Sequence, residues 1–343
     1  MKKIIVTGGC GFIGSNLIRH LLKKKNFVIN IDKLSYSANP YNLKGINKKK
    51  YIFIKSDIGN KKKIISILDK YKPKIIFNLA AETHVDRSIE SPASFINNNF
   101  LSVFNLLEAI KYYNKRSKNK TKLLHVSTDE VYGDITKKLK RSSENDSYNP
   151  SSPYAASKAS ADHLIKSYIR TYNFPAIISN CSNNYGPRQF PEKIIPKLIH
   201  NIINNKTLPV YGNGLNSREW IYVEDHCKAL EILSIKGKIG DSYNIGSGQD
   251  LSNIKLAKLL IKTMKRKLLK IDKKVRIQFV EDRPGHDFRY ALNSNKMYKK
   301  FKWKASTKIN VGIRKTVDWY VDNLDYFKSI SKKNFVNRIG LKL

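Results

Sequence analysis

Cysteine is scarce in this chain. Only three cysteines occur among 343 residues, and Cys10, Cys181 and Cys227 lie far apart. A disulfide framework needs paired cysteines, and a structural zinc site needs closely spaced cysteine and histidine ligands. The sequence therefore predicts neither, and we expect no metal site. A reducing compartment, the cytoplasm, fits this composition.

Acidic residues are also few. The chain has 27 aspartates and glutamates against 65 lysines and arginines, which gives a net charge of +38. Such an excess is typical of nucleic-acid-binding proteins, but lysine is spread over the whole chain among many asparagines and isoleucines. No aromatic and basic stacking motif accompanies it. We expect no specific nucleic-acid partner, and a noncatalytic nucleic-acid-binding protein is the alternative from another functional class.

Long apolar runs are missing as well. No hydrophobic segment approaches the roughly 20 residues that span a bilayer, so we expect no membrane partner. Hydrophobic residues nevertheless make up 41% of the chain. That content is enough to bury a full core, in one large domain or in two unequal ones.

Short β-branched runs alternate with helical patterns over the first half of the chain. This alternation predicts a doubly wound parallel α/β sheet, and near-continuous apolar strands suit a sheet covered on both faces. The pattern supports one domain over 1–186, a return segment near 222–250 and a smaller mixed α/β lobe over most of 187–330. The expected strands are 3–7, 27–31, 51–55, 75–79, 122–126 and 176–179, and the expected helices are 12–24, 61–71, 93–114 and 153–172.

A glycine-rich loop follows the first expected strand and opens the first expected helix. It reads Gly8-Gly9-Cys10-Gly11-Phe12-Ile13-Gly14, a spacing that lets backbone approach a pyrophosphate at a helix N-terminus. Asp32 ends the second strand, where a carboxylate accepts from both ribose hydroxyls and repels a 2′-phosphate. The pattern predicts a Rossmann domain that binds NAD rather than NADP. Asp57, which ends the third strand, is either an adenine contact or a helix cap.

Two adjacent carboxylates stand near a tyrosine–lysine pair. Asp129 and Glu130 follow Thr128 at the end of the fifth strand, and Tyr154 and Lys158 lie one helical turn apart. A tyrosine that acts as a base near neutral pH needs its pKa lowered by about three units. The Lys158 ammonium and an oxidised nicotinamide can supply that change, while Thr128 holds the same substrate hydroxyl. Two adjacent carboxylates beside this pair suggest proton abstraction and leaving-group protonation coupled to hydride transfer.

Together these motifs resemble the extended short-chain dehydrogenase/reductase family, in its nucleotide-sugar branch, and within it the dTDP-glucose 4,6-dehydratases. The resemblance extends from the first residue to about residue 320. The stretches that carry it are 79–88 (LAAETHVDRS), 127–133 (STDEVYG), 152–163 (SPYAASKASADH), 180–187 (NCSNNYGP), 190–196 (FPEKIIP), 222–226 (YVEDH) and 282–287 (DRPGHD).

The resemblance implies an NAD-dependent lyase of deoxysugar biosynthesis. Tyr154 would assist oxidation of dTDP-glucose at C4, Glu130 would remove the C5 hydrogen, Asp129 would protonate the departing 6-hydroxyl, and hydride would return to C6. Epimerases of the family lack an acidic pair at 129–130, which disfavours a 4-epimerase. A UDP-, CDP- or GDP-sugar dehydratase stays open. The resemblance also implies a homodimer through the helices near 93–114 and 153–172.

The resemblance also implies one set of residues that contact the cofactor and another that contact the substrate. Part of the substrate set lies in the expected substrate-binding lobe. Arg218 and Arg283 suit a diphosphate because a guanidinium forms bidentate, charge-assisted hydrogen bonds. Glu219 stands where relatives usually carry aspartate, a change we expect to be harmless. The implied cofactor contacts are Gly8, Gly11, Phe12, Ile13, Gly14, Asp32, Lys33, Asp57, Ile58, Leu79, Ala80, Ala81, Tyr154, Lys158 and Asn184. The implied substrate contacts are Thr83, Thr128, Asn183, Lys193, Pro209, Tyr211, Arg218, Asn253, Arg283 and His286.

Overall fold

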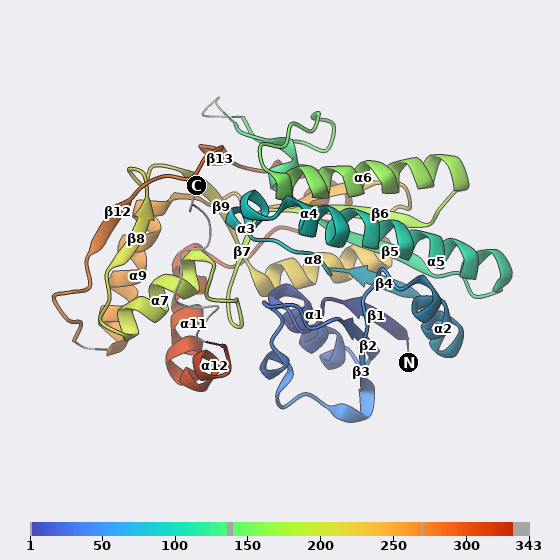
Figure 1. The fold of residues 1–343 in the computed structure, drawn as a ribbon, viewed down its shortest axis with the longest axis horizontal. Helices are drawn as coiled ribbons and strands as arrows, with labels where there is room; N and C mark the ends of the chain where they lie inside the picture. Colours follow the sequence, from blue (N-terminus) through green and yellow to red (C-terminus); the bar gives the residue numbers. More distant parts are fainter. Residues whose placement is uncertain (1, 136–139, 269, 332–343) are drawn as a thin grey trace.

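A parallel β-sheet with helices on both faces forms the centre of the molecule (Figure 1). The computed structural model describes residues 2–135, 140–268 and 270–331. The strand order is β3-β2-β1-β4-β5-β6-β10. The order in which successive strands are added reverses between β1 and β4, as in other doubly wound folds. The predicted fold class is confirmed. The strands are β1 Lys3–Thr7, β2 Phe27–Asp32, β3 Tyr51–Lys55, β4 Ile75–Asn78, β5 Lys122–Thr128, β6 Ala176–Cys181 and β10 Ser242–Ile245.

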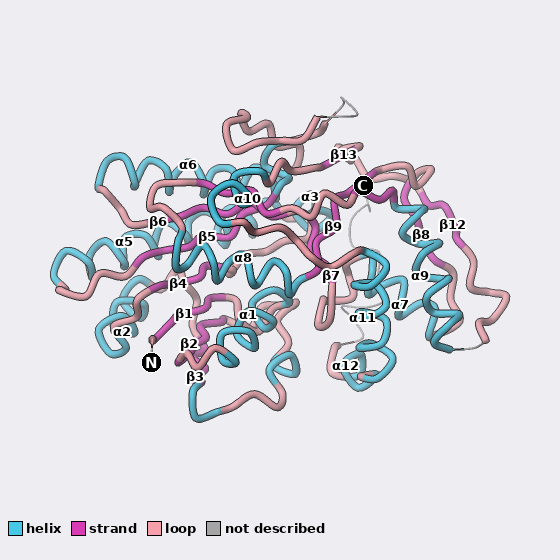
Figure 2. The backbone as a smooth tube through the Cα atoms, turned by 180° about the vertical axis from the view of Figure 1, so that it is seen from behind, coloured by secondary structure: helices cyan, strands magenta, loops and turns pink. Residues whose placement is uncertain are grey.

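Apolar side chains from both helical layers bury the sheet. One hydrophobic cluster joins Leu17 and Leu21 of α1 and Leu230 of α8 to the strands, and another joins helices α2, α5 and α6 to the opposite face. Figure 2 shows α1 and α8 together on one side of the sheet. These helices are α1 Phe12–Lys23, α2 Lys61–Tyr71, α5 Ser102–Arg116, α6 Pro153–Tyr172 and α8 Val223–Lys236.

A smaller group of elements lies at one end of the sheet, on the left in Figure 1. Its core is rich in aromatic side chains, among them Tyr185, Trp220 and Tyr320. Strand β9 pairs with β7, β11 and β13, and β8 pairs with β12. The elements are β7 Asn183–Tyr185, α7 Ile194–Ile203, β8 Leu208–Tyr211, β9 Ser217–Tyr222, β11 Asp250–Ser252, α9 Asn253–Leu268, β12 Ile277–Val280, β13 Arg289–Tyr290, α11 Ile309–Asp322 and α12 Leu324–Lys328. Helix α10, Asn295–Phe301, packs instead against β10 of the central sheet. The exact boundaries of the two domains stay a prediction.

The helix predicted over 93–114 is divided. A short helix α4, Pro92–Phe95, continues into a π-helix, Ile96–Leu101, before α5 begins. Asn99 explains the wider turn: its side chain accepts from the Glu82 N–H at 2.8 Å and donates to the Glu82 carbonyl at 2.9 Å and to Ser157 Oγ at 3.0 Å. A π-helix turns an additional residue inward. Asn99 thereby ties the chain after β4 to helix α6.

Candidate active site

One cavity lies where the carboxyl ends of the central strands meet the smaller group of elements. All the implied cofactor contacts line it, and so do Thr128, Asp129, Glu130, Tyr154 and Lys158. Of the implied substrate contacts, Thr83, Thr128, Asn183 and Lys193 also line it. The structure therefore gathers these side chains from separate strands at one edge of a parallel sheet.

The glycine loop packs closely against the backbone around it. An added Cβ would approach Ala80 backbone atoms to 2.9 Å at Gly8 and the Gly8 carbonyl oxygen to 2.3 Å at Gly14, so larger residues would not fit. Gly11 precedes α1 without a side-chain cap, which leaves the first N–H groups of that helix free to bind an anion. These features fit a dinucleotide.

Asp32 is held at the end of β2 by two backbone N–H groups. Its carboxylate accepts from Cys10 N at 2.9 Å and from Leu34 N at 2.8 Å. Asp57 accepts from Lys33 Nζ at 3.2 Å, whereas Asn60 accepts from Lys63 N and caps α2. Asp57 Oδ1 also accepts from Gly59 N at 2.7 Å, so Asp57 lies beside Lys33 in the cavity and Asn60, not Asp57, is the cap of α2.

The two adjacent carboxylates differ in their surroundings. Burial, then the charges of Glu130 and Glu219, raise the pKa of Asp129 well above its ordinary value. Burial also raises the pKa of Glu130, but the positive charges of Arg283, Lys193 and Arg218 lower it. Burial and like charge thus favour the protonated form of Asp129. The pKa of Glu130 is raised on balance as well, but the neighbouring cations offset part of that shift. Thr128 Oγ1 caps the short helix Asp129–Tyr132 by accepting from Glu130 N at 3.3 Å.

Tyr154 and Lys158 lie on α6, and both are buried. Burial first, and then the charge of Glu130, raise the pKa of Tyr154 well above 10. Lys158 Nζ donates to the Val126 carbonyl at 2.9 Å and lies 3.2 Å from His125 Nε2. The hydrogen bonds of Lys158 are therefore made to β5. The spacing of Tyr154 and Lys158 in the sequence did not indicate this orientation.

A second cluster gathers several implied substrate residues around Asp86. The Asp86 carboxylate accepts from Arg283 Nη1 at 2.9 Å and from the Tyr211 hydroxyl at 2.9 Å. His286 lies beside the Tyr211 ring, with ring centroids 6.1 Å apart. Asp86 belongs to α3, Val85–Glu90, so the cluster joins the sheet domain to the smaller lobe.

Arg218 approaches the same region from β9. It is buried, donates to the Asp287 carbonyl at 3.0 Å and lies over the Tyr290 ring at 4.4 Å. Two other implied substrate contacts lie outside both the cavity lining and the contacts around Asp86: Pro209 pairs with Gln278 between β8 and β12, and Asn253 begins α9.

Several lining residues were not among the sequence-based candidates. Phe190, Glu192 and Trp220 line the cavity, and Glu192 accepts from the Tyr36 hydroxyl at 3.0 Å and from Arg87 Nε at 3.2 Å. Glu192 lies in the FPEK stretch, directly before the implied substrate contact Lys193. That position in the sequence could have identified Glu192 as a site residue. Trp220 gave no such signal, because only the pairing of β9 with β7 places it there.

Comparisons with known proteins agree with this geometry. The family model described as GDP-mannose 4,6 dehydratase matches residues 5–316. A dTDP-glucose 4,6-dehydratase of Neisseria meningitidis serogroup B is 41% identical over 352 aligned positions, which cover 99% of each chain.

Solved structures give the same result. DesIV, a dTDP-glucose 4,6-dehydratase of Streptomyces venezuelae with NAD bound, is 34% identical with a TM-score of 0.88, covering 96% of this chain and 100% of the other. A dTDP-glucose 4,6-dehydratase of Bacillus anthracis in complex with NAD is 39% identical with a TM-score of 0.86, over 96% and 100% of the two chains. The chain therefore belongs to the GDP-mannose 4,6-dehydratase family and groups within it with the dTDP-glucose 4,6-dehydratases.

Proposed function

We propose that the protein is an NAD-dependent hydro-lyase that converts dTDP-glucose into dTDP-4-dehydro-6-deoxyglucose for the synthesis of rhamnose-type deoxysugars. One observation carries this proposal: the buried Asp129, whose pKa burial raises, stands beside Glu130 in the cavity that Tyr154 and the glycine loop also line. Elimination of water needs one group to accept a proton and another to donate one, whereas a simple dehydrogenase does not use such a pair. The named relatives support the same substrate.

The first step is removal of the proton from the sugar 4-hydroxyl. NAD, when bound, supplies a hydride acceptor at C4 and later a hydride donor at C6, so the cycle consumes no net oxidant. Tyr154 takes the hydroxyl proton, and Thr128 holds the same oxygen. Because burial raises the pKa of Tyr154 well above 10, the tyrosine becomes a base only when positive charge is present in the cavity. Lys158, anchored to the Val126 carbonyl, fixes the helix that carries Tyr154.

The second step is elimination of water. A ketone at C4 acidifies the hydrogen on C5, and Glu130 removes that hydrogen as the base. The nearby charges of Arg283, Lys193 and Arg218 favour the carboxylate form that this task requires. Asp129 donates its proton to the departing 6-hydroxyl, a task for which burial and its anionic neighbours prepare it.

The nucleotide part of the substrate would occupy the side of the cavity near Asp86. Arg283 and Arg218 offer guanidinium groups to the diphosphate, and Tyr211 and His286 lie next to Arg283. The remaining candidates, dehydratases that act on another nucleotide sugar and a 4-epimerase, differ in the base pocket and in the use of Asp129.

The choice among these candidates is tested with a panel of nucleotide sugars. Purified protein with catalytic amounts of NAD should convert dTDP-glucose into a 4-keto-6-deoxy sugar, detected by its absorbance in alkali. We expect kcat/KM for UDP-, CDP- and GDP-glucose to be lower by about tenfold or more, the size of a difference in binding of about 1.4 kcal/mol. A 4-epimer as the product, or a preference for another base, would contradict the assignment.

We also propose a homodimer that forms through α5, α6 and the π-helix. Leu101 is 44% exposed, Phe104 40%, Tyr112 52% and Tyr172 52%, and such a gathering of large apolar side chains on neighbouring helices suits a protein interface. A Phe104→Arg variant should sediment as a single chain while the wild type sediments at twice that mass. Ile235→Arg, at a residue 61% exposed on α8, is the control on another helix and should stay dimeric.

The cytoplasm is the proposed location. The three cysteines are buried and free of disulfides, which suits a reducing compartment. In residues 2–135, 140–268 and 270–331, no helix has the length and apolar character needed to cross a membrane. We propose that neither nucleic acid nor a membrane is a specific partner.

A further inference from the structure

Three neighbouring strands of the central sheet carry a buried chain of hydrogen bonds that ends beside Lys158. Thr7 Oγ1, at the end of β1, accepts from the N–H groups of Leu79 and Ala80 at 3.2 Å each. It donates to Asn78 Oδ1, on β4, at 2.6 Å. A hydroxyl oxygen has two lone pairs, and the two backbone donors use both. The Thr7 hydroxyl proton therefore points to Asn78, which fixes the amide oxygen on the Thr7 side.

The Asn78 amide in turn fixes the tautomer of His125 on β5. Asn78 Nδ2 faces His125 Nδ1 at 3.0 Å, and because an amide nitrogen only donates, Nδ1 is the ring nitrogen that accepts. Burial, and then the charge of Lys158, lower the pKa of His125 well below its ordinary value, so the ring is neutral. A neutral imidazole carries one proton, and in His125 that proton lies on Nε2.

The Nε2 proton faces two polar side chains of α6. His125 Nε2 lies 3.2 Å from Lys158 Nζ and 3.6 Å from Asp162 Oδ1. Because Nε2 carries a hydrogen, the ring accepts none from Lys158. The hydrogens of Nζ are left for the Val126 carbonyl, at 2.9 Å, and for the cavity that Lys158 lines beside Tyr154.

The Asp162 carboxylate is held so that one oxygen remains for the His125 proton. Oδ2 accepts from Ser127 Oγ at 2.6 Å, from the Tyr148 hydroxyl at 3.2 Å and from Asn180 Nδ2 at 3.4 Å. Among the residues that the structure describes, no group donates to Oδ1 within hydrogen-bond distance, although Asp162 is fully buried. A buried oxygen without a donor is costly, and the Nε2–H of His125 is the donor that faces it.

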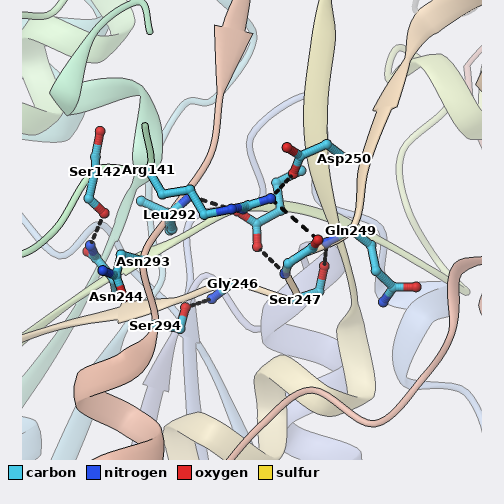
Figure 3. A network of polar contacts seen from close by, with 12 residues as sticks. Arg141, Ser142, Asn244, Gly246, Ser247, Gln249, Asp250, Leu292, Asn293 and Ser294 are labelled. Atoms are coloured by element: carbon cyan, nitrogen blue, oxygen red, sulfur yellow. Dashed lines mark hydrogen bonds and ion pairs between the residues drawn. The ribbon is translucent and has the colours of Figure 1, made fainter. Parts of the chain in front are cut away.

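The loop that carries Tyr148 is itself fixed nearby. Figure 3 shows the Arg141 side chain extended toward Asp250, to which Nη2 donates at 2.8 Å. The Ser142 carbonyl accepts from Asn244 Nδ2 at 2.9 Å in the same view. The loop is thus anchored on β10 and β11, and it presents the Tyr148 hydroxyl to α6.

We propose, on the basis of the proposed function, that His125 is a positioning residue that acts through Lys158 in the oxidation step. Its neutral ring donates from Nε2 to Asp162. It thereby holds Lys158 Nζ toward the Val126 carbonyl and the cavity, where Tyr154 takes the 4-hydroxyl proton. The substrate sugar does not contact His125, which has 0% exposure and lies outside the cavity lining. Loss of the ring therefore slows oxidation and leaves nucleotide binding unchanged.

Two substitutions of similar size separate this role from a structural one. In His125→Gln the side-chain amide reaches the place of Nε2 and keeps an N–H for Asp162. In His125→Asn the shorter amide reaches only the place of Nδ1 and keeps the bond to Asn78. Stopped-flow absorbance at saturating NAD and dTDP-glucose should show NADH formation by His125→Gln at close to the wild-type rate. His125→Asn should form NADH about 100-fold more slowly, with KM for dTDP-glucose unchanged in both variants.

Ser179→Ala is the matched control. Ser179 is buried, and its Oγ donates to the His125 carbonyl at 3.3 Å, so this variant removes a hydrogen bond of His125 without changing the ring. It should lower the thermal midpoint and leave NADH formation unchanged. Rates are compared well below the midpoint of each variant. Equal rates in the two His125 variants, a faster His125→Asn, or a Ser179→Ala as slow as His125→Asn would overturn the proposal.

Asp162→Asn carries the test if neither His125 variant folds. Tyr148 and Asn180 donate to Oδ2, so the amide oxygen stays there and an N–H takes the place of Oδ1. The ring then faces a donor, and NADH formation should fall about 100-fold. A wild-type rate would overturn the proposal. If the wild type itself forms neither NADH nor keto sugar from dTDP-glucose, the proposed function fails instead, so the two failures are distinguishable.

Discussion

A Tyr154→Phe variant should lose turnover of dTDP-glucose by about 1000-fold, within the range that a positioned acid–base group contributes. It should also form no enzyme-bound NADH, because the phenolic oxygen is the group that accepts the 4-hydroxyl proton as hydride leaves C4. The phenyl ring keeps the edge-to-face contact with Phe95, whose centroid lies 6.3 Å from that of Tyr154. Stopped-flow absorbance of reduced nicotinamide measures the step directly.

Tyr148→Phe is the matched control for this variant. Tyr148 is partly buried outside the cavity lining, and its hydroxyl donates to Asp162 Oδ2 at 3.2 Å. We expect that variant to form NADH at close to the wild-type rate. NADH formation by Tyr154→Phe at the wild-type rate would remove Tyr154 from the mechanism.

A Glu130→Gln variant should separate the two halves of the reaction. Oxidation at C4 should continue slowly, because Tyr154 is intact, while dehydration should fall by about 100- to 10,000-fold for want of a base at C5. Bound NADH should therefore accumulate where the wild type shows only a transient. Exchange of the C5 hydrogen with deuterated water should disappear in parallel.

Glu224→Gln provides the control, since Glu224 is an exposed glutamate on α8. It should behave as the wild type in both assays. Full turnover by Glu130→Gln would show that another group removes the C5 hydrogen, and loss of NADH formation together with dehydration would show that Glu130 also serves the first step.

The features that the sequence alone predicted are those set by local pattern and by sheet topology. The ends of β1, β2, β4 and β5 meet at one edge of a parallel sheet, so Gly8, Asp32, Leu79 and Thr128 could be grouped without coordinates. Each lines the cavity in the structure. The roles of these residues stay a prediction that the variants above test.

What the sequence could not predict depends on contacts between distant segments. The direction of Lys158 depends on the Val126 carbonyl, and the π-helix depends on how Asn99 binds Glu82 and Ser157. The bond between Arg141 and Glu219 joins residues 78 positions apart. No local pattern encodes such a pair, and the expectation that glutamate at 219 is a harmless change stays a prediction.

The most direct test of the proposed reaction follows deuterium placed at C4 of dTDP-glucose. The mechanism moves the C4 hydrogen to C6 of the same sugar and takes the C5 hydrogen of the product from solvent. Nuclear magnetic resonance of the product should therefore show deuterium at C6 and none at C4, with no net NADH formed. Deuterium retained at C4 in an epimerised sugar, or a sugar returned unchanged, would contradict this account.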